Sequence, residues 1–248
     1  NDFTLKMYLY SFTQYAGFDR VFLLKEENLN LQAGDLLQSG SDFFLVLWEE
    51  ISFSELYTTL YTWSTNFSLA YKKLLSEPTL QLLHRMSYQR YTSYKKVMQL
   101  FLDSDIEKLI LKGKKTSKKE QTINFQLGKI NIQNEKKGQI LVVFPDLWTF
   151  HNSIDLAKTG GTFLSSLDTQ SKKNSNWRKI KTWNEKLIFC TWSEIFQDFQ
   201  VLEKIYLVEP QKWYYASQQD PRYKVESVLK KMGELYGAEM ITIESEML

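Results

Sequence analysis

The chain has 248 residues, 43% of them hydrophobic and 24% charged, a composition that fits a globular protein of one large domain or two modest ones. A net charge of +2 is too small to indicate nucleic-acid binding by itself, so that signal must come from local clusters of Lys and Arg. The single cysteine, Cys190, excludes an intrachain disulfide, and no apolar run approaches the roughly 18 residues of a membrane span, so we expect a cytoplasmic protein without membrane contact.

The first part of the chain predicts a β-rich segment followed by helices. Residues 31–36 are typical of a turn that leads into a strand. Residues 52–75 and 78–102 predict two helices, and Pro78 fits the first turn of the second one. Strands are expected at the following segments: 5–12, 21–24 and Asp42–Trp48.

The rest of the chain alternates short apolar runs with helical segments, as an α/β fold with a parallel sheet does. Two buried strands, 187–189 and 205–208, each end in polar or turn-forming residues. Because ligands of open α/β sheets bind beyond the carboxyl ends of the strands, we expect 191–193 and 209–212 to lie side by side at one edge. The other expected elements are helices at 122–134 and 225–234 and strands at 140–144 and 238–243.

Residues 109–223 resemble the first motor lobe of the primosomal replication-restart helicases, the family of primosomal protein N′. More loosely, 31–36 and 75–102 are similar to segments of the amino-terminal DNA-end-binding domain of that family. The firmer similarity rests on five collinear segments: LILKGKKTSKKE (109–120), ILVVFPDL (140–147), LSSLD (164–168), NWRKI (176–180) and the run from CTWSEIFQDF to DPRY (190–223).

The resemblance implies a nucleotide site whose key residues are altered. Glycines let the backbone wrap closely around phosphates, but Thr116 and Lys118 stand where the family has glycine. The segment is equally consistent with a solvated basic loop. Pro210 stands at the catalytic glutamate and can neither accept a proton nor orient a water molecule. The positions that remain similar to the family's nucleotide site are Gly113, Ser117, Lys119 and Glu209.

These changes predict a protein that is not an enzyme and that uses no cofactor and no metal. Glu209 is one methylene longer than the magnesium-holding aspartate of the family, which displaces its oxygens. The chain stops at Leu248, so we expect the second motor lobe to be missing. The two histidines, His84 and His151, have no partner at a metal-ligand spacing.

DNA binding is the chemistry that the sequence supports best. Lys and Arg concentrate at 112–119, 172–186 and 222–231, and aromatic residues accompany the later two clusters. Cations beside aromatic rings suit single-stranded DNA, whose bases stack on the rings. These aromatic residues are Trp177, Trp183, Trp213, Tyr214, Tyr215 and Tyr223. The alternative is that the Trp residues pack inside and the Lys residues only solvate helices. The candidate nucleic-acid-binding residues are Lys118, Lys119, Arg178, Lys212, Arg222 and Tyr223.

We therefore predict an α/β protein with a β-rich plus helical domain at 1–105 and one RecA-like parallel-sheet lobe at 106–248. The leading hypothesis is a non-catalytic relative of the restart helicase that binds single-stranded or forked DNA or replication proteins. Alternatives are a protein-interaction module without DNA binding and, less favoured, an active DNA-dependent ATPase. The open face of the lobe, with Trp192 and Trp213, is expected to bind another protein or a second copy of the chain.

Overall fold

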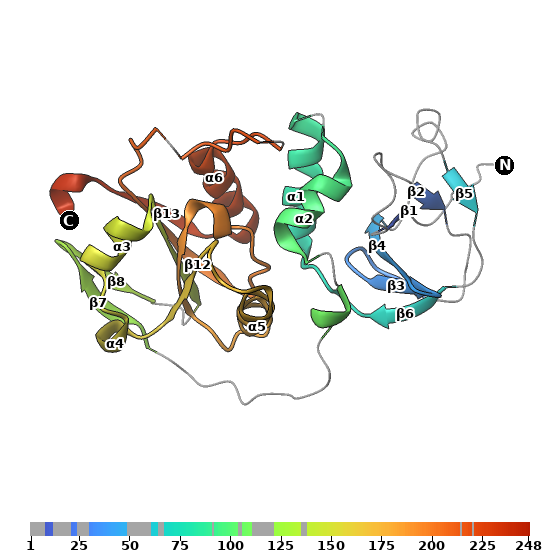
Figure 1. Ribbon diagram of the computed structural model, residues 1–248, viewed down its shortest axis with the longest axis horizontal. Helices are drawn as coiled ribbons and strands as arrows, with labels where there is room; N and C mark the ends of the chain where they lie inside the picture. Colours follow the sequence, from blue (N-terminus) through green and yellow to red (C-terminus); the bar gives the residue numbers. More distant parts are fainter. Residues whose placement is uncertain are drawn as a thin grey trace. The chain divides into compact units, whose positions relative to one another are not determined.

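The computed structural model divides the chain into two compact units, Asn1–Ile110 and Leu111–Leu248 (Figure 1). The phosphate-loop positions predicted from the sequence, Gly113, Ser117 and Lys119, lie outside the described residues, as do Lys118 and Tyr214. The described residues are 8–11, 21–23, 30–48, 61–63, 67–90, 92–103, 106–110, 122–134, 138–213, 215–219 and 221–248.

The first unit is built on a six-stranded sheet in the order β5-β2-β1-β4-β3-β6. Neighbouring strands are antiparallel except for β2 and β5, which run parallel. The strand predicted at Asp42–Trp48 is confirmed, and strands also lie within the predicted segments 5–12 and 21–24. The elements are β1 (Tyr8–Ser11), β2 (Val21–Leu23), β3 (Leu36–Ser39), β4 (Asp42–Trp48), β5 (Tyr61–Trp63), β6 (Ser68–Tyr71), α1 (Glu77–Arg90), α2 (Tyr94–Phe101) and a 3₁₀ turn, η2 (Ile106–Lys108).

The helix predicted at 52–75 is wrong, because β5 and β6 lie within it. The segment is rich in Thr and aromatic residues, which fit the pleated surface of a sheet better than a helix. The helix predicted at 78–102 is two helices, α1 and α2. Ser93 begins the second one, since its side chain accepts a hydrogen bond from the Lys96 backbone at 3.3 Å.

A buried carboxylate fixes the turn predicted at 31–36, which is confirmed. Asp35 is fully buried and accepts hydrogen bonds from the backbone N–H groups of Gln32 at 2.9 Å and of Lys73 at 2.8 Å. Gly34 precedes it with a φ of 90°, a conformation that glycine adopts at little cost. The turn thereby ties the start of β3 to the segment that leads into α1.

His84 joins the sheet of the first unit to α1 and α2. Its ring lies on α1, stacks on Trp48 of β4 at 4.4 Å between ring centroids, and contacts Tyr94 of α2. Nε2 lies 3.2 Å from the Leu47 carbonyl oxygen, and Nδ1 lies 3.2 Å from the Tyr94 hydroxyl. A carbonyl can only accept, so Nε2 carries the proton and Nδ1 accepts from Tyr94 in the neutral ring.

We expect the first unit to lose stability as the pH falls below about 6.5, the ordinary pKa of histidine. Burial lowers the pKa of His84, while the hydrogen bond to Leu47 and the charge of Glu77 oppose the shift less strongly. The folded ring resists protonation, so the unfolded chain binds the proton first. Urea unfolding between pH 7.5 and 5.5 should show a fall in free energy of unfolding that a His84→Gln variant lacks and a variant of the exposed His151, His151→Gln, retains. An equal fall in both variants would contradict this role of His84.

The second unit is built on five parallel strands in the order β10-β11-β9-β12-β13. The strands expected at 140–144, 187–189, 205–208 and 238–243 and the helix expected at 225–234 are confirmed with small changes of length. The elements of the sheet and its helices are β9 (Gln139–Phe144), α3 (Leu147–Ser153), α4 (Leu156–Thr159), β10 (Thr162–Leu164), α5 (Gln170–Lys181), β11 (Leu187–Thr191), η3 (Trp192–Glu194), β12 (Leu202–Val208), α6 (Val225–Tyr236), β13 (Glu239–Ile243) and η4 (Ser245–Met247).

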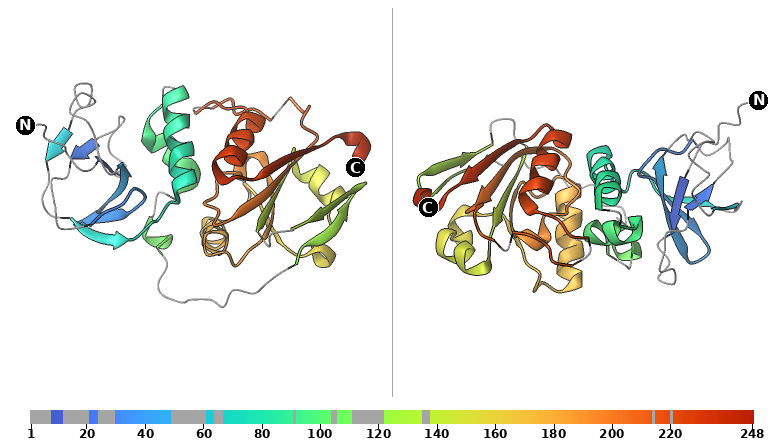
Figure 2. Two further views of the ribbon diagram at one scale, coloured as in Figure 1. Left: turned by 180° about the vertical axis from the view of Figure 1, so that it is seen from behind. Right: turned by 90° about the horizontal axis from the view of Figure 1, so that it is seen from above.

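The parallel sheet is covered on both faces, which explains its continuous apolar strands. All residues of β9 and β11 are buried. Figure 2 shows α5 and α6 on one face of the sheet and α3 with a β-hairpin on the other. On the hairpin side, Phe144 and Phe189 form the centre of the core with Phe150 of α3, whose ring centroid lies 5.3 Å from that of Phe144.

That hairpin corrects the helix predicted at 122–134. The segment forms β7 (Asn124–Leu127) and β8 (Ile130–Gln133), joined by Gly128 and Lys129, with Gly128 at a φ of 55°. Leu127 and Ile132 are buried in the core, and the apolar residues recur at every second position, which is the period of a strand. The helix expected to follow the phosphate loop is therefore replaced by a hairpin at 122–134.

Candidate functional site

Parallel strands bring the segments that follow them to one side of the second unit, which we call the carboxyl edge. It is formed by residues 145–148 after β9, 165–169 after β10, 191–194 after β11, 209–213 after β12 and 244–248 after β13. The expected pair, 191–193 and 209–212, does share this edge. The two segments are not neighbours, however, because β9 lies between β11 and β12.

Large apolar side chains are exposed along this edge. Trp148 is 77% exposed, Leu167 80% and Trp213 81%, and Met247 also reaches solvent. Each follows a different strand, and β9 and β12, which precede the two tryptophans, are adjacent in the sheet. Burying such residues in water-free contacts is favourable, so their concentration at one edge indicates a binding surface.

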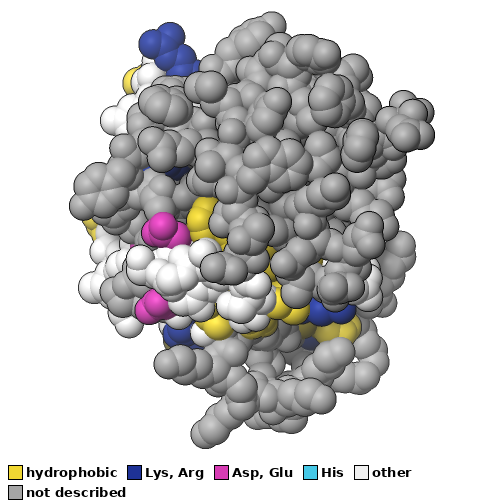
Figure 3. All heavy atoms as spheres, turned by 90° about the vertical axis from the view of Figure 1, so that its right-hand side faces the viewer, with side chains coloured by type: hydrophobic (Ala, Val, Ile, Leu, Met, Phe, Trp, Pro, Cys, Tyr) yellow, Lys and Arg dark blue, Asp and Glu magenta, His cyan; other side chains and the backbone are white. Residues whose placement is uncertain are grey.

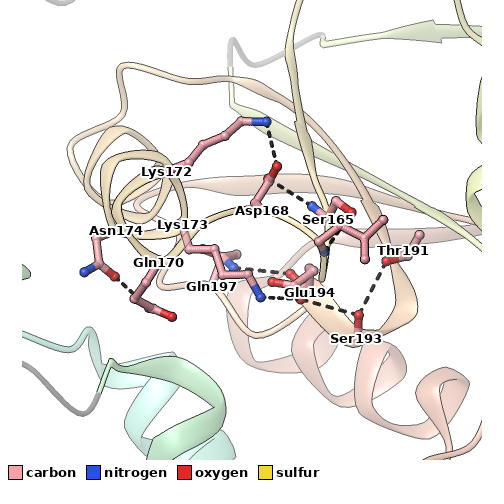
Figure 4. A network of polar contacts seen from close by, with 11 residues as sticks. Ser165, Asp168, Gln170, Lys172, Lys173, Asn174, Thr191, Ser193, Glu194 and Gln197 are labelled. Carbon is pink, nitrogen blue, oxygen red and sulfur yellow. Dashed lines mark hydrogen bonds and ion pairs between the residues drawn. The ribbon is translucent and has the colours of Figure 1, made fainter.

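Ion pairs occupy the part of the edge beside β10 and β11 (Figure 4). Lys172, in the first turns of α5, donates to Asp168 at 2.6 Å, and Lys173 donates to Glu194 at 3.1 Å. Ser165 contributes its backbone N–H to Asp168 at 3.3 Å. These lysines are already paired with carboxylates, so this part of the edge is close to neutral rather than basic.

Glu209 lies at the end of β12, where its carboxylate is held by neighbouring residues. It is buried, its Oε1 accepts a hydrogen bond from the Ser245 hydroxyl at 2.6 Å, and its Oε2 lies 3.8 Å from the Lys212 ammonium. Its backbone N–H donates to the Ile243 carbonyl oxygen at 2.7 Å. The Glu209 carboxylate therefore has both a hydrogen-bond partner and a cation within the chain, and Pro210 follows it.

The structure brings together only some of the predicted nucleic-acid-binding residues. Lys212 and Arg222 lie in the connection between β12 and α6, at the carboxyl edge, and Arg222 is exposed. Arg178 lies in the last turn of α5, and since that helix runs back from the carboxyl edge, Arg178 lies toward the opposite edge. Lys118 and Lys119 fall outside the described residues.

Several of the aromatic candidates are buried, although the alternative interpretation, that the Trp residues pack inside, holds for Trp177 and not for Trp213. Tyr223 packs edge-on against Phe196 at 5.1 Å between centroids, and burial, helped by the charge of Glu194, raises the pKa of its hydroxyl. Trp177 and Tyr215 are buried too. Their rings are therefore not available to stack on a base.

Sequence reasoning missed Trp148 and Leu167. Trp148 follows the Asp146 that caps α3, whose carboxylate accepts from the Thr149 backbone at 2.7 Å. A tryptophan just after a cap at a strand's carboxyl end is a signal that could have been read from the sequence. Trp192, expected on the open face, is only partly exposed.

A scan of the chain against models of known protein families finds no match, and no curated protein matches it significantly. Among the helices that the structure describes, none has the length and apolar character needed to cross a membrane. The same described residues hold no cluster of three or more His, Cys, Asp or Glu suited to a metal ion.

Proposed function

We propose that the protein is a non-hydrolysing relative of the primosomal replication-restart helicases and that it binds single-stranded or forked DNA. A single RecA-like lobe in the second unit is part of this proposal. The five-stranded parallel sheet supports it, with the Glu209 and Ser245 segments after adjacent strands β12 and β13. The motif similarity of residues 109–223 points to the same family.

The observation that carries the proposal is the pair of exposed tryptophans. Trp148 and Trp213 follow strands that are hydrogen-bonded neighbours, and neighbouring strands are about 4.8 Å apart. The two tryptophans therefore follow adjacent strand ends at the carboxyl edge. Exposed aromatic rings bind single-stranded nucleic acid by stacking on bases, with little regard for sequence.

The connection from β12 to α6, which carries Trp213, also holds the exposed cations Arg222 and Lys224. Lys212 precedes Trp213 directly, and its ammonium lies 3.8 Å from the Glu209 carboxylate. These cations offer phosphates a small number of contacts. Figure 3 draws the right-hand side of Figure 1, which belongs to the first unit, and the described Lys and Arg side chains there lie at separate places rather than as one patch. In the second unit, few exposed cations follow β12, so base stacking rather than phosphate neutralisation should supply most of the affinity.

A protein partner is the second candidate, and Leu167 favours it. This side chain is 80% exposed beside the neutralised Lys172–Asp168 pair. An apolar residue in a neutral setting suits a protein surface better than a phosphate backbone. Capture of a replication protein or a second copy of the chain that depends on Leu167, in a protein that binds no oligonucleotide, would favour this candidate.

We expect no DNA-stimulated ATP hydrolysis above background. Glu209 is held by Ser245, Pro210 cannot position a water molecule, and β7 and β8 stand where the family would place the helix after its phosphate loop. Phosphate release measured with and without forked DNA tests this directly. Turnover that disappears in a Lys119→Ala variant would show that the protein is an ATPase.

A further inference from the structure

The exposed ring of Trp213 sits on a firmly braced turn. The Lys212 backbone N–H donates to the Glu209 carbonyl oxygen at 3.1 Å, and the Tyr215 N–H donates to the Lys212 carbonyl oxygen at 3.2 Å. The buried Tyr215 hydroxyl donates to the Val208 carbonyl oxygen at 2.7 Å. The turn is therefore anchored on both sides of the tryptophan.

Glu209 connects this turn to the end of β13. Its carboxylate accepts the Ser245 hydroxyl at 2.6 Å, and the Gln211 side chain donates to the same hydroxyl oxygen at 2.8 Å. The Glu209 backbone N–H adds a bond to Ile243 at 2.7 Å. Three groups of the turn thus converge on residues at or just after the end of the neighbouring strand.

Glu209 also has a φ of 48°, which a side chain with a Cβ rarely adopts. Such a conformation costs free energy and persists only where the surroundings hold it in place. Here the surroundings are the bonds to Ser245 and Ile243. Strained residues of this kind collect at functional sites, where the strain fixes the orientation of a group.

We infer that Glu209 is a positioning residue, whose carboxylate holds the 209–213 turn so that Trp213 is presented at the carboxyl edge. This inference rests on the proposed function, in which a fixed Trp213 ring stacks on a DNA base. In the restart-helicase family that the chain resembles, the residue that corresponds to position 209 is an acid that holds magnesium. In this chain the carboxylate instead takes the Ser245 hydroxyl and orders an aromatic side chain.

The free protein provides the first test. Trp213 emission is isolated as the difference between each protein and the same protein carrying Trp213→Phe, and its anisotropy decay and acrylamide quenching are measured. Glu209→Ala and Ser245→Ala should give faster local motion of Trp213 and at least twofold greater quenching. Glu209→Gln keeps an oxygen that can accept from Ser245, so it should behave as the unchanged protein does. Unchanged Trp213 mobility in both alanine variants would overturn the inference.

Binding of a fluorescein-labelled oligothymidylate provides the second test. Glu209→Ala should weaken binding at least fivefold, Glu209→Gln by less than twofold, and Glu209→Ala should have no further effect when added to Trp213→Ala. An equal loss in both backgrounds would show that Glu209 does not act through Trp213. If Glu209→Ala fails to fold, Ser245→Ala, an exposed position, takes its place. If the unchanged protein binds no oligonucleotide, the proposed function fails, while the mobility measurement still decides the role of Glu209.

Discussion

Replacing Gln139 with leucine should destabilise the second unit by about 3–4 kcal/mol. This side chain is fully buried at the start of β9 and makes four hydrogen bonds. Its Nε2 donates to the Ile180 and Glu185 carbonyl oxygens, both at 2.9 Å. Its Oε1 accepts from the backbones of Gln200 at 2.8 Å and Val201 at 3.2 Å. Leucine has a similar size but leaves these backbone groups without that partner.

Urea unfolding followed by tryptophan fluorescence measures this loss. The matched control is Gln200→Leu, since the Gln200 side chain is exposed and its backbone N–H is unchanged by the substitution. The control should alter the free energy of unfolding by less than about 0.5 kcal/mol. A Gln139→Leu protein as stable as the control would show that these four bonds do not hold the end of α5 and the start of β12 together.

The second large effect concerns binding. Trp148→Ala and Trp213→Ala should each weaken the affinity for single-stranded DNA about tenfold, because losing one base stack costs roughly 1–3 kcal/mol. Both side chains are mostly exposed, so neither substitution should change the free energy of unfolding by much. Titrations of a labelled oligothymidylate, followed by fluorescence anisotropy, provide the dissociation constants.

Val201→Ala is the control for these variants. Val201 is also an exposed apolar residue, but it directly precedes β12 and so lies at the edge opposite the tryptophans. Its loss should leave DNA affinity unchanged. Equal weakening by all three substitutions would show that the effect does not come from base stacking at the carboxyl edge.

The strands of the second unit could be predicted because they are apolar throughout. A run such as 187–189 can only be a buried segment, and turn residues mark its end. The family resemblance implies a helix at 122–134, but apolar residues at every second position favour the hairpin that forms there. The helix predicted at 52–75 is wrong because Thr and aromatic residues there favour a strand. β5 pairs with β2 and β6 with β3, and this pairing stabilises the strands.

The candidate site was predicted only in part. Trp213 and Glu209 were placed at the carboxyl edge because strand ends can be read from the sequence. The exposure of a ring could not be predicted from the sequence. Tyr223 and Trp213 are both aromatic residues in the connection after β12, but Tyr223 is buried against Phe196 and Trp213 is exposed. The sequence also does not show that Lys172 pairs with Asp168, an ion pair that makes this part of the surface nearly neutral.

The most direct test of the central claim is the salt dependence of the affinity of the unchanged protein for single-stranded DNA. A site built on Trp148 and Trp213 with the exposed cations Arg222 and Lys224 should bind at low salt. The logarithm of its association constant should fall against the logarithm of salt concentration with a slope of about −1.4, since each neutralised phosphate contributes roughly −0.7. No detectable binding at low salt, or a slope several times steeper that persists in the Trp148→Ala and Trp213→Ala variants, would contradict the account.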